Sequence, residues 1–478
     1  MNIQNAHEPQ LNAESAFVGV AFNRLFLWST CTVAALGGLL FGYDWVVISG
    51  ADIFYEKYFN LISATDIGWA KSCALAGCLV GSLFAGALSD TFGRKLLLIL
   101  SAVLFTVSSL ATGLSNTFSV FVTWRIVGGA AIGLASILSP LYIAEIAPPA
   151  IRGKLVSLNQ LNIVIGIVLA QVVNWLVAQP VPSGATTLEI LNSWNGQHGW
   201  RWMFCLAAVP SALFLLGMLF VPESPRWLIK NGQRQKAQSV FTRLNGEKFA
   251  AQSVAEVEAT LVNEIHKVDI RELLEPGVLR IVGFGALLAF IVQWCGINVI
   301  FYYTKDVFAA AGYKVSAILL NIIIVGATNL VFTFVALQTV DRLGRRWLTL
   351  VGWGGLTVIF LAIGYCFSAG VTGLPVVLLV ILSIGCYAAT IAPLCWVTLA
   401  EIFPNRIRGA AMATAVFALW IGNLTLTYLF PAMLAKFGAA GVFWIFAAIC
   451  AGGFLFMKAK LPETKGKTLE QIERELLA

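Results

Sequence analysis

The sequence is poor in charged residues and in histidine. Asp, Glu, Lys and Arg together make up 12% of its 478 residues, and there are three histidines, whereas soluble domains carry about 25% charged residues. The histidines, His7, His198 and His266, fall in predicted loops, so we expect no imidazole inside an apolar segment to relay protons. This composition argues against a water-soluble protein.

The sequence also lacks the residue patterns of an enzyme. It shows no cluster of metal ligands, no nucleophile paired with a base and no phosphate-binding loop. Its nine cysteines all lie in apolar stretches without CxxC or Cys/His spacing, so we interpret them as small core or lipid-facing residues. We therefore expect no enzymatic activity, no metal and no cofactor, and a process driven by a gradient or by the substrate itself.

Long hydrophobic stretches dominate the chain. Hydrophobic residues make up 59% of it and the mean hydropathy is +0.83. A membrane-spanning helix needs about 20 consecutive apolar residues, so we predict an all-α integral membrane protein with about twelve transmembrane helices. The predicted centres of the spans are Leu39, Leu79, Val107, Ala131, Val168, Leu213, Phe290, Ile324, Phe360, Ser383, Leu419 and Ala448.

Basic residues cluster in alternate loops and predict the orientation. Because cytoplasmic loops retain Lys and Arg, we expect both termini in the cytoplasm. The net charge of +7 is then explained by the orientation in the membrane and does not indicate nucleic-acid binding. The first apolar stretch is too long for a cleavable signal peptide. The predicted units are a cytoplasmic tail (1–23), a six-helix bundle (24–221), a cytoplasmic linker with amphipathic helices (222–278), a second six-helix bundle (279–458) and a cytoplasmic tail (459–478).

The two predicted bundles contain an internal repeat. Residues 144–153 (AEIAPPAIRG) and 400–409 (AEIFPNRIRG) are identical at seven of ten positions, and 90–95 (DTFGRK) recurs as 341–346 (DRLGRR). Transporters built from two repeated halves place the substrate site near the membrane midplane, between the halves, and rock around it. The repeat therefore indicates transport.

Several motifs resemble those of the sugar porter family in the major facilitator superfamily, over about residues 36–467. They are GGLLFGYD at 37–44, GALSDTFGR at 86–94, RIVGG at 125–129, PESPRW at 222–227, GIN at 296–298, the tyrosine pair at 302–303 and PET at 462–464. The resemblance extends to bacterial proton-linked xylose and hexose symporters and to the facilitative glucose carriers of animals. It implies the major facilitator fold and a monosaccharide substrate.

Asp44 lies in the middle of the first predicted span, where an ionised carboxylate is costly and should face a partner or a cavity. The resemblance pairs it with Arg125 in the fourth span, and proton symporters of the family carry a carboxylate where facilitative carriers have an amide. Pairing with Arg125 keeps Asp44 ionised, and protonation releases the contact. We therefore expect Asp44 to accept the transported proton; a purely structural ion pair is the alternative.

Polar and aromatic residues in the middle of the spans suit a sugar, which needs neutral hydrogen-bonding groups and aromatic faces. The resemblance assigns these residues to substrate binding: Phe41, Gln160, Gln293, Asn298, Asn329, Trp396 and Trp420. It assigns Tyr302 and Tyr303 to an outer gate. The alternative for each is helix-to-helix bonding or contact with lipid.

The chain departs from the family pattern at Val292, Leu419 and Ala392, where polar partners or a glycine are usual, so the identity of the sugar stays open. Trp45 stands where many relatives have a small residue, and its indole either desolvates Asp44 or faces lipid. Three other mid-span amides have no counterpart in the family and are interpreted as interhelical bonds: Asn162, Gln171 and Asn174.

Charged residues at the cytoplasmic ends of the spans are expected to close the inner side in the outward-open state. A network of such pairs present in one state biases the equilibrium, while simple solvated anchors are the alternative. These gate residues are Asp90, Arg94, Glu145, Arg152, Glu223, Arg226, Asp341, Arg345, Glu401, Arg408 and Glu463.

The sequence thus favours a proton-coupled pentose or hexose symporter of the cell membrane, working as a monomer. A facilitative sugar or polyol uniporter, for example for an inositol, is the alternative. A non-transporting sugar receptor would be expected to carry a long cytoplasmic tail, whereas about twenty residues follow Lys458.

Overall fold

The computed structural model describes residues 22–148, 151–182, 185–263, 275–313, 315–403 and 407–461, and these residues form helices and loops without a β-strand. Residues 1–21 of the N-terminal tail, 264–274 of the linker and 462–478 of the C-terminal tail lie outside the described residues. The nine cysteines are all free.

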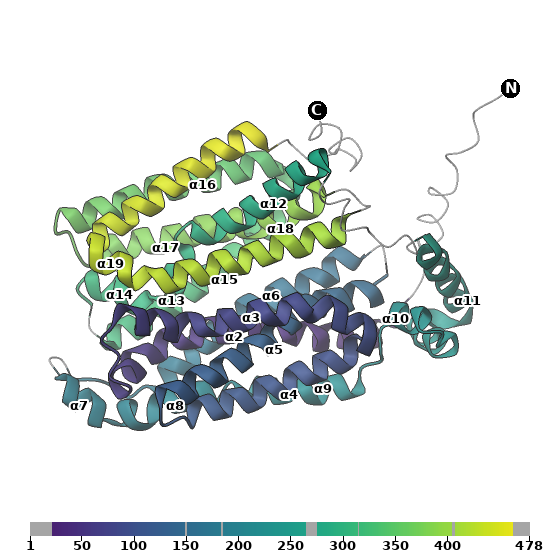
Figure 1. Cartoon of the computed structure of the whole chain (residues 1–478), viewed down its shortest axis with the longest axis horizontal. Coiled ribbons are helices and arrows are strands. Elements are labelled where there is room, and N and C mark those ends of the chain that lie inside the picture. The colour runs from purple at the N-terminus through teal and green to yellow at the C-terminus, as the bar shows by residue number, and fades with distance from the viewer. Residues whose placement is uncertain are drawn as a thin grey trace.

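The first half of the chain forms one helical bundle. It contains α2 (Arg24–Tyr58), α3 (Ala64–Phe92), α4 (Arg94–Gly113), α5 (Phe118–Ile146), α6 (Arg152–Val177), α7 (Thr187–Asn192), a π-helical turn (Asn195–Gly199), α8 (Trp200–Cys205) and α9 (Ala208–Phe220). Side chains that precede a helix cap several of these, as Asn23 does when its Oδ1 accepts the backbone N–H of Phe26 at 3.1 Å. Figure 1 shows this bundle as the purple and blue layer.

The second half forms the green and yellow layer of Figure 1. It contains α12 (Pro276–Trp294), α13 (Ile297–Tyr302), α14 (Thr304–Ala310), α15 (Val315–Leu343), α16 (Arg345–Ser368), α17 (Leu374–Ala389), α18 (Ile391–Ile402) and α19 (Arg408–Lys460). Between the layers α2 contacts α13 and α14, α6 contacts α15, and α3 contacts α19.

The prediction of an all-α protein with about twelve spans is confirmed. Eleven segments of the described residues are long and apolar enough to cross a membrane. The last of them, α19, has 53 residues and would be about 80 Å long if straight. Gly438 has non-helical dihedral angles, with φ +66°, and divides α19 into two helices. Every predicted span centre lies inside one of these helices.

Small residues allow the helices of the first bundle to approach closely. A Cβ added to Gly42 or Gly166 would collide with the backbone of the facing helix in the α2–α6 pair, and the same holds for Gly77 and Gly129 between α3 and α5. Close packing of this kind is typical of helix pairs in lipid, where small residues bring the backbones together.

Two helices lie beyond one end of the bundles, α10 (Pro225–Lys230) and α11 (Arg234–Asn263). α11 is interrupted by non-helical dihedral angles at Asn245 and Gly246, which separate two shorter helices. The amphipathic patterns at 233–244 and 254–265 therefore fall on helices, apart from residue 233, which precedes α11, and residues 264–265, which lie outside the described part of the chain.

The prediction that all histidines lie in loops is wrong for His198. It lies in the π-helical turn that leads into α8, and its ring is exposed and 5.3 Å from that of Trp194. The turn is held by Asn195, whose side chain bonds the backbone of Gln179 in both directions at 2.8 Å. His7 and His266 lie outside the described residues.

Candidate functional site

Asp44 and Arg125 form a buried ion pair inside the first bundle. The carboxylate comes from the middle of α2 and the guanidinium from the first third of α5, and the residues are 7% and 4% exposed. The guanidinium carbon also lies 5.4 Å from the ring centre of Phe204. Because the surroundings are apolar, each charge depends on the other for stabilisation.

Five aromatic side chains meet between the two bundles. Phe41 stacks on Trp45, with ring centres 6.1 Å apart, and touches Trp420 of α19 at 5.7 Å. Trp45 in turn lies 5.2 Å from Phe301 and 6.2 Å from Tyr302, both in α13. The indole of Trp45 therefore faces the second bundle, which excludes the lipid-facing alternative.

The polar pair Gln293 and Asn298 flanks a break in the helix that carries it. α12 ends at Trp294 and α13 begins at Ile297, with Gly296 between them at φ +92°. The Nδ2 of Asn298 donates to the Oε1 of Gln293 at 2.6 Å across this break. Broken helices near the midplane are how many transporters present polar groups to a substrate.

Three other residues expected at the substrate site are not joined to this group. Asn329 is buried in α15, Gln160 is half-buried in α6, and Trp396 in α18 is 42% exposed. Within the described residues their side chains form no hydrogen bond or ring contact with the aromatic group or with Gln293. In this conformation the aromatic surface of the site thus comes from Trp420 rather than from Trp396.

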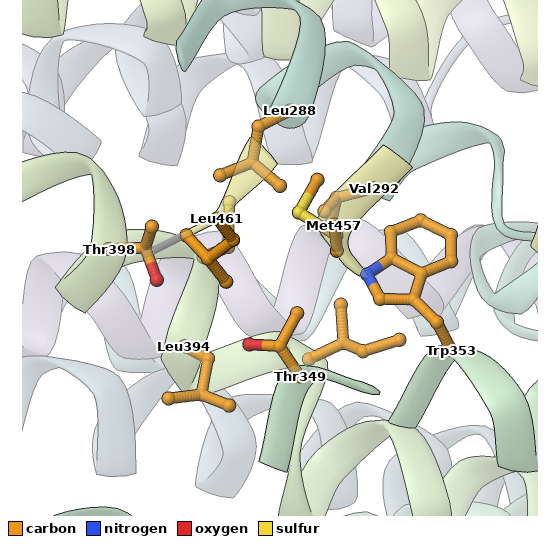
Figure 2. A pocket seen from close by; sticks show the side chains of 10 residues that line it. Leu288, Val292, Thr349, Trp353, Leu394, Thr398, Met457 and Leu461 are labelled. Carbon is orange, nitrogen blue, oxygen red and sulfur yellow. The ribbon is translucent and has the colours of Figure 1, made fainter. Parts of the chain in front are cut away.

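Val292 does not share the environment of its neighbour Gln293. It lines a small cavity inside the second bundle with Trp353, Met457 and Leu288, shown in Figure 2. Thr349 and Thr398 add hydroxyl groups to this mostly apolar lining. The valine therefore fills space between helices of one half, while Gln293 bonds to Asn298.

The three amides interpreted as interhelical differ in their contacts. Asn174 does bond between helices, because its Nδ2 donates to the carbonyl of Val47 at 2.9 Å. The interpretation is wrong for Asn162, whose Nδ2 donates to Leu158 in its own helix at 2.9 Å. The Oε1 of Gln171 is buried without a partner among the described residues, and it lies against Gly326 of α15.

A second charged group, which we call the five-charge cluster, was not predicted. Lys71 of α3 pairs with Asp52 of α2 and lies 3.7 Å from Glu56 and 3.6 Å from Asp306. Lys305 of α14 pairs with Glu56 and lies 3.9 Å from both Asp52 and Asp306. Two cations and three carboxylates from both bundles therefore meet at the end opposite to α10 and α11.

The tyrosine pair reinforces the same connection. The ammonium of Lys71 donates to the backbone carbonyl of Tyr302 at 3.1 Å and lies 4.0 Å from the ring centre of Tyr303. The hydroxyl of Tyr303 donates to the carbonyl of Thr427 at 2.6 Å. At this end the two halves are thus joined by ion pairs, by the hydrogen bond from Lys71 to Tyr302 and by a cation–π contact, while the bond from Tyr303 to Thr427 lies within the second half.

At the opposite end, the charged motif residues of the first half pair with one another. Arg94 lies 2.9 Å from Glu145 and 3.4 Å from Asp90. Glu223 accepts the backbone N–H groups of Arg94 and Lys95 at 3.1 Å. Burial raises the pKa of the Glu223 carboxyl above its ordinary value, although these hydrogen bonds oppose the shift.

The second half repeats part of this arrangement. Arg345 lies 3.2 Å from Glu401, as Arg94 does from Glu145, so each of these ion pairs lies within one half. The side chains of Asp341 and Arg408, and Glu463 as a whole, lie outside the described part of the structure. Arg152 is exposed and forms no ion pair with a described residue, and Arg226 is half-buried in α10.

The sequence and structure of the chain are similar to those of known proteins. Residues 30–476 match the family described as "Sugar (and other) transporter". The chain is 39% identical to the D-xylose-proton symporter of Escherichia coli K12 over 483 residues, covering 95% of this chain and 96% of the relative. It is 38% identical to the arabinose-proton symporter of Bacillus subtilis over 442 residues, covering 92% and 93%.

Among solved structures, the xylose transporter of Escherichia coli in an inward-open conformation matches with a TM-score of 0.82. The two are 36% identical, and the match covers 94% of this chain and 100% of that structure. The two-layered helical arrangement of Figure 1 is thus shared over nearly the whole chain.

Proposed function

The chain belongs to the sugar transporter family of the major facilitator superfamily, and we propose that it is a multi-pass membrane protein that carries a monosaccharide together with a proton. The observation that carries the proton coupling is the buried pair of Asp44 and Arg125. It is a titratable acid in the middle of a span, held ionised by one partner that a proton can replace.

In the proposed orientation α10, α11 and both termini lie in the cytoplasm. The basic residues of the loops at that end, such as Arg94, Lys95 and Arg152, support this through the retention of positive charge on the cytoplasmic side. The five-charge cluster then lies at the external side of the cell membrane. The protein works as a monomer in the bilayer, since each chain contains both halves of the site.

The sugar binds between the halves, next to the aromatic group of Phe41 and Trp420. Gln293 and Asn298 bond to each other in this structure, and both can exchange that bond for sugar hydroxyls because an amide donates and accepts. Gln160, Asn329 and Trp396 reach the sugar from α6, α15 and α18 when the halves close around it.

Protonation of Asp44 couples the proton to the movement of the halves. The neutral carboxyl no longer holds Arg125 electrostatically, so the contact between α2 and α5 weakens. The Arg125 guanidinium retains its contact with the ring of Phe204 in the first bundle. α2 also carries Phe41 and Trp45, and its release therefore changes the surface that touches both the sugar and the second bundle.

The structure represents the state that is closed toward the outside. The five-charge cluster and the contacts of Lys71 with Tyr302 and Tyr303 join the halves at the external end, whereas the ion pairs Arg94–Glu145 and Arg345–Glu401 each lie within one half. In the outward-open state the external contacts separate, and charged residues of the two halves approach one another at the cytoplasmic end.

The test is a measurement of medium pH when sugars are added to deenergised cells that express the protein. The panel is D-xylose, arabinose, D-glucose and myo-inositol, with Asp44→Asn beside the wild type. We expect alkalinisation with one sugar, its loss in Asp44→Asn, and counterflow of labelled sugar in both proteins. The exposed acid Asp66 provides a control, because Asp66→Asn should retain alkalinisation.

The outcomes separate the proposal from the alternative. Counterflow without proton movement in the wild type makes the protein a facilitative carrier, with Asp44 a structural partner of Arg125. Loss of both counterflow and alkalinisation in Asp44→Asn, at unchanged expression, assigns the ion pair to folding or to sugar binding.

A further inference from the structure

Trp45 lies where the two halves meet, on the face of α2 that points to the second bundle. It is one helical turn beyond Phe41, and together they form a continuous stacked surface with 11° between the ring planes. Phe41 reaches Trp420, while Trp45 reaches Phe301 and Tyr302. Trp45 therefore lies between the candidate sugar site and the five-charge cluster.

The indole of Trp45 carries a hydrogen-bond donor that the chain leaves unused. Its Nε1 is buried, and it has no acceptor among the described residues. Buried donors in folded proteins are nearly always paired, so an unpaired donor between the moving halves indicates an acceptor supplied from outside the chain. The polar pair Gln293 and Asn298 is joined by a hydrogen bond of its own, and neither amide accepts from the Trp45 Nε1.

The chemistry of a sugar fits this position. The ring of an indole covers the C–H face of a pyranose, and a hydroxyl oxygen accepts a hydrogen bond from a neutral donor. An anionic ligand fits less well, because the nearest charge on α2 is the carboxylate of Asp44 in the adjacent position.

We propose that Trp45 is a substrate-binding residue whose ring forms the external wall of the sugar site and whose Nε1–H donates to one hydroxyl of the bound monosaccharide. This inference rests on the proposed function, since it names a further contact of the same site. It makes Trp45 a determinant of sugar specificity, because a sugar that lacks the accepting hydroxyl leaves the donor unpaired.

The test measures sugar binding to the purified full-length protein by isothermal titration calorimetry, with the same panel of four sugars. Trp45→Phe keeps an aromatic ring and removes the N–H. We expect it to raise the Kd of the preferred sugar about two- to tenfold, the effect of one neutral hydrogen bond. Monodeoxy forms of that sugar identify the acceptor: one of them should bind wild type and Trp45→Phe equally.

Trp353 provides a matched control, because its Nε1 is also buried without a described partner but it lies in the cavity within the second bundle. Trp353→Phe should leave the Kd of every sugar unchanged. Trp45→Tyr, which keeps a ring and moves the donor, replaces Trp45→Phe should the latter fail to fold, and it should also weaken binding.

Three results would overturn the inference. They are an unchanged Kd in Trp45→Phe, an equal loss with every monodeoxy sugar, and an equal loss in Trp353→Phe. Failure of symport is a different result. If the wild-type protein binds sugar but moves no protons, the proton coupling of the proposed function is contradicted. The proposed contact of Trp45 with the sugar is not affected by that result.

Discussion

The ammonium of Lys71 is paired with the carboxylate of Asp52 in the interior of the protein, and both side chains are fully buried. The pair connects α2 with α3 inside the first bundle, and Lys71 extends the connection to Asp306 of the second. A buried charge has lost its hydration, so each member depends on the other and on the remaining charges of the cluster.

Removing Lys71 alone should strongly destabilise the protein. Lys71→Met keeps the length of the side chain but leaves Asp52 buried with a single cation, Lys305, at 3.9 Å. Breaking a buried pair from one side costs about 3–5 kcal/mol. The thermal unfolding midpoint of the purified protein in detergent should fall clearly.

The double variant Asp52→Leu with Lys71→Met tests the cause. Because it removes both charges and fills the space with apolar atoms, its midpoint should lie well above that of Lys71→Met. Equal midpoints for the single and double variants would show that the loss comes from packing around Lys71 rather than from an unpaired carboxylate.

Lys305 should control the closure of the external side. It pairs with Glu56 across the two halves, and this contact is absent once the halves separate. Lys305→Gln should therefore favour the outward-open state, and a pair worth ~1 kcal/mol shifts that equilibrium about fivefold. The measurement is the labelling rate of Ser49→Cys, a buried position of α2, by a membrane-impermeant maleimide added outside the cells.

Lys57 provides the control for this experiment. It lies on α2 near Glu56 but forms no ion pair with a described residue, so Lys57→Gln should leave the labelling rate unchanged. A similar increase in both variants would point to a general change of surface charge, and no increase in Lys305→Gln would exclude the pair as a closing contact.

The fold could be predicted because it rests on quantities that the sequence states directly. Span number follows from apolar length, and the repeated motifs indicate two halves. Asp44 could be singled out because a charge in the middle of a span is costly, whatever its neighbours are. The same rule could have singled out Lys71, because the span that contains it is as apolar as that of Asp44.

The five-charge cluster went unpredicted because its members are scattered over three helices. Asp52 and Glu56 lie near the end of α2, where they share a helical face with Trp45. Their meeting with Lys305 depends on where α13 and α14 lie after the break at Gly296. The opposite environments of Val292 and Gln293 likewise depend on helix rotation, which motif comparison does not give.

Glu223 should give the stability of the protein a dependence on mildly acidic pH. Burial raises the pKa of its carboxyl above the ordinary 4.5, so the folded protein binds this proton more tightly than the unfolded chain does. The contribution of Glu223 to stability is then fully present below the ordinary pKa and is lost as the pH rises through the raised value.

The measurement is the thermal midpoint of wild type and Glu223→Gln between pH 4.5 and 7.5. The neutral glutamine lacks this titration, so the difference between the two midpoints should shift in favour of the variant as the pH rises. The exposed acid Glu247 supplies a reference, since Glu247→Gln should follow the wild type. A constant difference between wild type and Glu223→Gln would contradict the raised pKa.

Gly296 should tolerate no side chain, because it sets the break between α12 and α13. Its φ of +92° is unfavourable for any residue with a Cβ, and a Cβ there would lie 2.7 Å from the ring of Phe446. The left-handed conformation alone costs about 1–2 kcal/mol. Gly296→Ala should therefore lower the thermal midpoint and weaken sugar binding, because the break directs Asn298 toward Gln293.

Two further variants separate the backbone from the contact. Gly283 lies in α12 with open space around it, so Gly283→Ala should leave the midpoint unchanged or raise it, as alanine favours a helix. Phe446→Ala removes the two atoms nearest to the added Cβ, Cγ and Cδ2, but it does not change the dihedral angle at position 296. In this background Gly296→Ala should therefore cost only part of what it costs in the wild type. No cost at all would assign the whole effect to Phe446, and the break would then require space rather than a glycine.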